Sequence, residues 1–168
     1  MRIARILVAL DGSPDAEIAL PKAVELVKQS AAAKVVLVRA VDPATLAGKA
    51  GNDVRAAAIN EASEYLSDVA ARLRSEGVRP VTRSVWLANA GQAISEVART
   101  VRPDLIVMTS GHRDDAGRLV PGPVAEFVRD RAEVPIVLVS AGDTRGGTPD
   151  RHVTETELGH ASPRAHAA

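Results

Sequence analysis

Asp11 is the first residue whose type and position could do chemistry, because it directly follows an apolar run from Ile3 to Leu10. A carboxylate at such a place can contact a small ligand. The two residues that follow, Gly12 and Ser13, support a second interpretation, since Asp-Gly-Ser is also a good turn and helix-cap sequence without any ligand. Both interpretations of Asp11 stay open at this point.

The sequence offers little for catalysis or for metal binding. It contains no cysteine, which removes thiol nucleophiles, thiolate zinc sites and disulfides. It shows no nucleophile elbow, no phosphate-loop lysine motif and no Ser-His-Asp order. His152, His160 and His166 have spacings that match no zinc pattern, and the adjacent Asp114 and Asp115 are more typical of a solvated loop than of a magnesium site. We therefore predict no catalytic residue and no metal ligand.

Five short apolar runs alternate with helical patterns and predict the elements that position these residues. The strands are expected at residues 3–10, 34–41, 81–87, 104–109 and 134–140, and the helices at about 14–27, 52–76, 89–101 and 122–132. Pro21 lies inside the first helix and should kink it or delay its start. Residues 42–51 and 110–121 are expected to form loops, the second of them long and polar.

This alternation predicts one α/β domain with a parallel sheet, right-handed crossovers and helices on both faces. In such folds ligands bind outside the carboxyl ends of the strands, where the strand order reverses. The rule directs attention to Asp11 and to the loops after Val41 and Thr109. Residues 141–168 contain glycines, prolines and no sustained apolar period. We therefore expect a domain over residues 1–140 and a disordered tail over 141–168.

The composition excludes several classes of function. The chain has 21 basic and 21 acidic side chains, so no net positive field attracts nucleic acid, and an aromatic fraction of 2% leaves almost no platform for stacking bases. No stretch approaches the roughly 20 apolar residues of a membrane span, and the first residues lack the features of a signal peptide. We therefore expect a cytoplasmic protein that binds neither nucleic acid nor membranes.

Three segments together resemble the universal stress protein family. They are ILVALDGS at residues 6–13, VLVRAV at 36–41, and a region that runs from DLIVMT at 104–109 through GPVAE at 122–126 to VPIVLV at 134–139. The resemblance covers about residues 2–140. It implies the adenine nucleotide alpha hydrolase-like fold, with a five-stranded sheet of order 3-2-1-4-5. It also implies a dimer paired through the last strand and, in many members, an ATP site.

The ATP-binding members share a loop written G-x-x-G, then nine residues, then G-S or G-T, in which backbone amides and a helix N-terminus hold phosphate oxygens. The ungapped match in this chain keeps only Gly122. Thr109 and His112 stand at the two earlier glycines, and Pro123, which has neither hydroxyl nor N–H, replaces the serine or threonine. Gly111 could stand in for the second glycine if the loop shifts by one residue.

Charged side chains could compensate for the missing glycines. Arg113, Arg118 and a protonated His112 could supply positive charge, although such residues more often belong to a solvated loop. The adenosine half matches the family better, since Asp11 matches the family acid near the adenosine end of the nucleotide. The resemblance assigns the nucleotide site to the following residues: Ala9, Leu10, Asp11, Ala40, Met108, Thr109, Gly111, His112, Arg113, Gly122, Pro123 and Val124.

The fifth predicted strand, which begins at Val134 and ends at Ser140, would lie at an edge of the sheet. An exposed apolar edge is a template for pairing, and self-pairing about a two-fold axis would cover it. We therefore expect a homodimer through this strand. The alternative is a strand capped by the tail.

Three functions remain open. The first is a stress-response or regulatory homodimer that binds ATP with magnesium, or AMP or cyclic AMP. The second is a dimeric interaction module that binds no nucleotide. The third, a slow ATPase, ranks last because no positioned base or activated nucleophile stands out. Fold alone does not decide among them.

Overall fold

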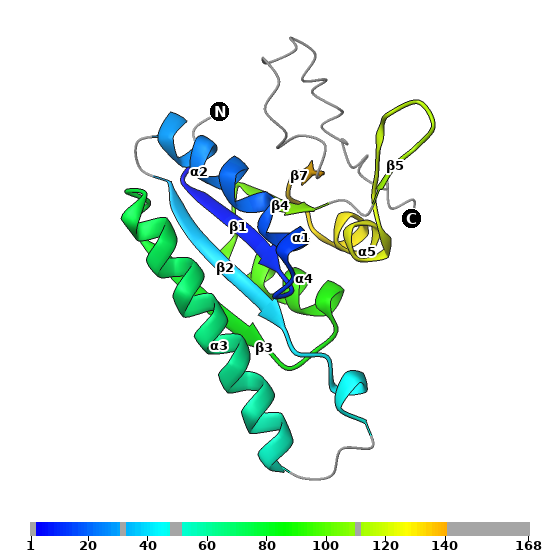
Figure 1. The fold of residues 1–168 in the computed structure, drawn as a ribbon. Helices are drawn as coiled ribbons and strands as arrows, with labels where there is room; N and C mark the ends of the chain where they lie inside the picture. The colour runs from blue at the N-terminus through cyan, green and yellow to red at the C-terminus, as the bar shows by residue number, and fades with distance from the viewer. Residues whose placement is uncertain (1–2, 31–32, 48–51, 110–111, 141–168) are drawn as a thin grey trace, which may run out of the picture.

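The computed structural model describes residues 3–30, 33–47, 52–109 and 112–140. Its centre is a five-stranded parallel sheet in the order β3-β2-β1-β4-β7 (Figure 1). The strands are β1 (Arg5–Leu10), β2 (Lys34–Ala40), β3 (Val81–Trp86), β4 (Leu105–Thr109) and β7 (Ile136–Val139). The predicted fold class and strand order are confirmed, with β7 as the predicted fifth strand.

Helices lie on both faces of the sheet (Figure 1). One face carries α1 (Pro14–Glu17), α2 (Ala19–Gln29) and α3 (Asn52–Ser75). The other face carries α4 (Ala90–Val101) and α5 (Pro123–Arg131). Each crossover from one parallel strand to the next therefore returns through helical structure, as a parallel sheet requires. No helix of the described residues has the length and apolar character needed to cross a bilayer.

The sheet separates two apolar clusters, because successive side chains of a strand point to opposite faces. Along β1, Ile6 and Val8 pack with α1, α2 and α3, whereas Leu7 and Ala9 pack with α4 and α5. The side chains of Ile6, Leu7 and Val8 are all fully buried. A strand that is buried on both faces explains why the sequence shows a continuous apolar run there instead of alternation.

Pro21 delays a helix, as predicted. The first helix ends at Glu17 and the second begins at Ala19, which places Pro21 in the first turn of α2. The missing N–H of a proline has little effect there, because the first N–H groups of a helix have no partner within it. Ile18 between the two helices keeps helical angles of φ −57° and ψ −23°, so the interruption is small.

The prediction of two irregular loops is wrong in part. Within the first, residues 43–46 form a short 3-10 helix, η1 (Pro43–Leu46), because the carboxylate of Asp42 accepts a hydrogen bond from the Ala44 N–H at 2.8 Å. Within the second, β5 (His112–Arg113) and β6 (Leu119–Val120) pair antiparallel as a small hairpin. The predicted tail over residues 141–168 lies outside the described residues, and so does Gly111.

Candidate functional site

The carboxyl ends of β1, β2 and β4 lie side by side in the sheet. The pairing of Leu10 with Arg39 places the last residue of β1 beside the end of β2, and β4 pairs with β1 from the other side. Because all strands are parallel, the loop after β1 and the chain that leads from β4 to α5 start at the same edge. This is also where the order of the strands reverses, so Asp11 and the ends of β2 and β4 lie at the edge where α/β folds bind ligands.

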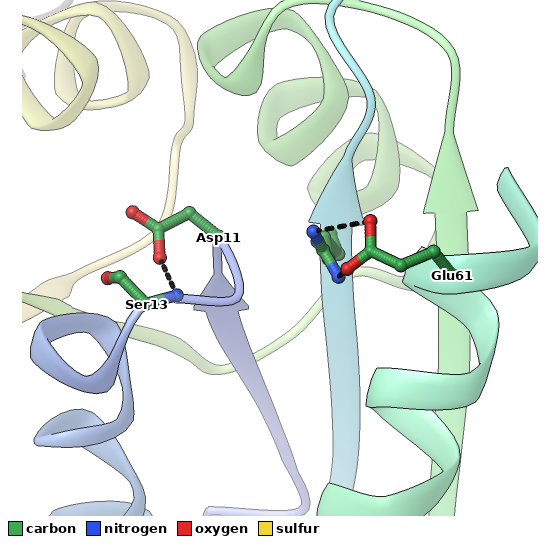
Figure 2. A network of polar contacts seen from close by, with 4 residues as sticks. Asp11, Ser13 and Glu61 are labelled. Atoms are coloured by element: carbon green, nitrogen blue, oxygen red, sulfur yellow. Dashed lines mark hydrogen bonds and ion pairs between the residues drawn. The ribbon is translucent and has the colours of Figure 1, made fainter. Parts of the chain in front are cut away.

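Asp11 lies exposed in the loop after β1 and takes part in a turn. Its carboxylate oxygen Oδ1 accepts a hydrogen bond from the Ser13 N–H at 2.7 Å (Figure 2). Ser13 in turn caps α1, because its hydroxyl accepts a hydrogen bond from the Ala16 N–H at 3.1 Å. Within the described residues the second carboxylate oxygen of Asp11 has no partner. The turn therefore leaves Asp11 able to accept a hydrogen bond from a ligand.

The residues predicted to line an adenine pocket do not share one face of the sheet. Ala9 and Met108 are buried in the cluster under α4 and α5. Ala40 is half-buried, and the alternation along β2 puts it on the same face as the buried Val38. Leu10 belongs to the opposite cluster, so its side chain packs with α1, α2 and α3. At this edge Leu10 can contribute only backbone groups.

The residues predicted to hold phosphate come from the end of β4, from the hairpin and from the start of α5. Thr109 ends β4 and is half-buried, whereas Pro123 and Val124 are exposed in the first turn of α5. Gly122 is the N-cap, with an ordinary φ of −77° and no side chain to accept a hydrogen bond from the first turn. The first N–H groups of a helix lack internal partners and can bind an anion, but Pro123 supplies none. The backbone of His112 and Arg113 lies in β5.

The hairpin between β4 and α5 is closed by one of its own carboxylates. Asp114 Oδ1 accepts hydrogen bonds from the N–H groups of Ala116 at 3.0 Å and Arg118 at 2.8 Å. Asp114 Oδ2 accepts one from the Arg118 side chain at 2.8 Å. The bond from the Arg118 backbone, together with its guanidinium, holds the pKa of Asp114 below its usual value. Arg118, which could have supplied charge to a phosphate, is thus paired inside the hairpin.

Sequence reasoning missed Arg39, which the structure places beside the Asp11 loop. Arg39 lies near the end of β2, and its side chain is only 13% exposed. Its two terminal nitrogens donate to Glu61 of α3 at 3.0 and 3.3 Å, and Figure 2 shows Glu61 reaching from the helix to the strand end. An arginine near the end of a strand whose other residues after Lys34 are apolar was the signal available in the sequence.

Comparisons with known proteins agree on one family. A model of the universal stress protein family matches residues 2–140. The solved structure of the hypothetical protein MJ0577 has a TM-score of 0.71 and 22% identity, covering 83% of this chain and 96% of that one. A universal stress protein family member from Burkholderia pseudomallei has a TM-score of 0.61 and 29% identity, covering 83% and 97%. A search of curated proteins finds no match.

Several similar structures contain nucleotides. The universal stress protein from Archaeoglobus fulgidus was solved with dAMP, with a TM-score of 0.58 and 24% identity over 83% of this chain and 100% of that one. Another universal stress protein was solved in complex with cAMP, and one from Arabidopsis thaliana with AMP bound. These ligands belong to those proteins.

Proposed function

This chain belongs to the universal stress protein family, and from that premise we propose that it binds an adenine nucleotide at the carboxyl edge of its sheet and acts as a regulatory homodimer in a stress response. The observation that carries the proposal is the meeting of three parts at one edge. These are the free carboxylate oxygen of Asp11, the half-buried ends of β2 and β4 at Ala40 and Thr109, and the start of α5 at Gly122.

We propose AMP or cyclic AMP as the better ligand and ATP with magnesium as the weaker one. One phosphate group can be met by the N–H groups of Val124 and Ala125 in the first turn of α5. Further phosphates need more donors, yet Pro123 has no N–H and Arg118 is paired with Asp114. The complexes of related proteins with AMP, dAMP and cAMP support a monophosphate.

Thermal unfolding with AMP, cyclic AMP or ATP, each with magnesium, tests the proposal. A ligand present at 100 times its dissociation constant stabilises the folded state by about 2.7 kcal/mol. For a chain of this size, that corresponds to a rise in Tm of about 5–10 °C. We expect AMP or cyclic AMP to produce this rise and ATP to produce a smaller one. No rise with any of them would favour the interaction module that binds no nucleotide.

Two variants of Asp11 separate ligand contact from the turn. Asp11→Asn keeps an oxygen that accepts the Ser13 N–H, whereas Asp11→Ala removes it. Both replace the free carboxylate oxygen, so we expect both to lose the rise in Tm with AMP. Only Asp11→Ala should also lower the Tm of the free protein, because it removes the turn. If the Tm of Asp11→Asn rises with AMP as much as that of the wild type, Asp11 does not contact the nucleotide.

The homodimer through β7 is a separate proposal with its own support. Ile136, Val137 and Leu138 stay half-exposed, and within the described residues β7 pairs with β4 alone. Pairing with a second copy would cover this apolar edge. We expect a mass in solution of twice the 17.6 kDa of one chain, and the same multiple for a chain truncated after Ser140. A monomer produced by the truncation would favour capping by the tail instead.

A further inference from the structure

The Arg39 guanidinium is held in one plane by two neighbours from α3. Glu61 accepts hydrogen bonds from both terminal nitrogens of Arg39, at 3.0 and 3.3 Å. The ring of Tyr65 lies one helical turn further along α3, and the guanidinium carbon is 5.0 Å from the ring centroid. A two-point bond to a carboxylate and a stack on an aromatic ring are the two contacts that fix the orientation of an arginine.

Gly12 rests directly on this guanidinium. A Cβ atom added to Gly12 would lie 2.9 Å from both Cζ and Nη2 of Arg39. A side chain at position 12 would therefore have to displace the guanidinium from its place between Glu61 and Tyr65. Gly12 also has a φ of +91°, a conformation that side chains disfavour. The loop after β1 thus takes an unusual path that brings its backbone against Arg39.

The surroundings of Arg39 do not maximise the free energy of unfolding. The Nε atom of Arg39 is buried without a hydrogen-bond partner. Burial and the nearby Glu17 carboxylate raise the pKa of Tyr65 far above its usual value. A buried polar group without a partner destabilises a fold, and an apolar residue at position 39 would avoid this one. What an apolar side chain would not supply is a flat, fixed surface under Gly12.

We propose that Arg39 is a positioning residue, which holds the loop after β1 so that Asp11 points its free oxygen toward the ligand. The proposal rests on the nucleotide site proposed above. Glu61 and Tyr65 fix the guanidinium, the guanidinium supports Gly12, and Gly12 lies between Asp11 and Ser13 in the turn. A second ion pair, between Glu17 and Arg72 of α3 at 2.8 Å, ties α1, the helix that follows this loop, to the same helix α3.

Backbone order at Gly12 and Ser13, measured by NMR relaxation, tests the support directly and needs no ligand. We expect order parameters near 0.85 in the wild type and below about 0.6 in Arg39→Met, which keeps the length of the side chain but not its plane. Arg39→Lys keeps the charge without the plane and should loosen the loop as well. Glu25→Gln removes an ion pair of the same 3.0 Å length on α2 and should leave the loop unchanged.

The affinity for AMP tests the consequence for the site. If the loop holds its binding conformation for a tenth of the time, the apparent Kd for AMP rises about tenfold. We expect this rise in Arg39→Met and a smaller one in Glu61→Gln, which also serves if Arg39→Met fails to fold. Wild-type order parameters in both Arg39 variants, or in Glu61→Gln alone if they do not fold, would overturn the proposal.

The two proposals fail in different ways. Should the wild type bind no AMP, the nucleotide site is wrong, and the order parameters alone then decide whether Arg39 holds the loop. Should AMP bind the wild type and Arg39→Met equally well, the site stands and Arg39 has no positioning role.

Discussion

Ile106→Ala is expected to lower the free energy of unfolding by about 2–5 kcal/mol, one of the two largest effects we predict. Ile106 lies in β4, is fully buried, and sits between Leu7 of β1 and Ile136 of β7. Its side chain packs in the cluster under α4 and α5. Truncation removes apolar contacts and leaves a cavity that the neighbouring strands cannot close, since both are held in register.

Urea unfolding monitored by circular dichroism measures this effect. Ile59→Ala is the matched control, because the same atoms are removed from a half-buried position on the first part of α3. None of residues 52–61 is buried, so the control should change the free energy of unfolding by less than about 1 kcal/mol. Equal losses in the two variants would contradict the packing described for β4.

Asp104→Ala is expected to lower the free energy of unfolding by about 2–3 kcal/mol, although the Asp104 side chain is only partly buried. Its oxygen Oδ2 accepts hydrogen bonds from the N–H groups of Ala4 at 2.7 Å and Arg5 at 2.8 Å. These bonds tie the residue before β4 to the start of β1 and help to set Ile6 opposite Leu105. A carboxylate that accepts two backbone bonds is worth more than an exposed ion pair.

Two further variants separate the effect of the Asp104 charge from that of its oxygen and provide a control. Asp104→Asn keeps an oxygen at the same place without the charge and should lose about half as much stability. Asp68→Ala, on the exposed side of α3, removes a carboxylate with no hydrogen bond in the described structure and should stay within about 0.5 kcal/mol of the wild type. A loss in Asp104→Ala no larger than in Asp68→Ala would show that the two bonds do not hold the strands.

The three central strands, β1, β2 and β4, could be predicted from the sequence because each is buried on both faces. Burial on both faces requires a continuous apolar run, and such a run can be recognised in the sequence without knowing the order of the strands. The order itself came from the resemblance carried by ILVALDGS and its companion segments, which the family match over residues 2–140 bears out. Periodicity alone could not have placed β3 at one edge and β7 at the other.

The hairpin of β5 and β6 could not be predicted in the same way. Each of its strands has two residues, which is too few to show an alternation of apolar and polar side chains. Its turn is closed by Asp114, and an aspartate is equally typical of a solvated loop. The contact between Gly12 and the fixed Arg39 guanidinium could not be predicted for another reason. The guanidinium is fixed by Glu61, which lies 22 positions later in the sequence, and nothing local marks such a pair.

The division of the core by the sheet has a consequence for how the sequence can change over time. A substitution at Leu66, in the cluster under α3, and one at Ile106, on the far side of the sheet, share no packing partner within the two clusters. Distant sites without shared partners add their effects independently. Compensating substitutions can therefore accumulate in the cluster on one face of the sheet independently of those in the other cluster, provided that the strands keep their register.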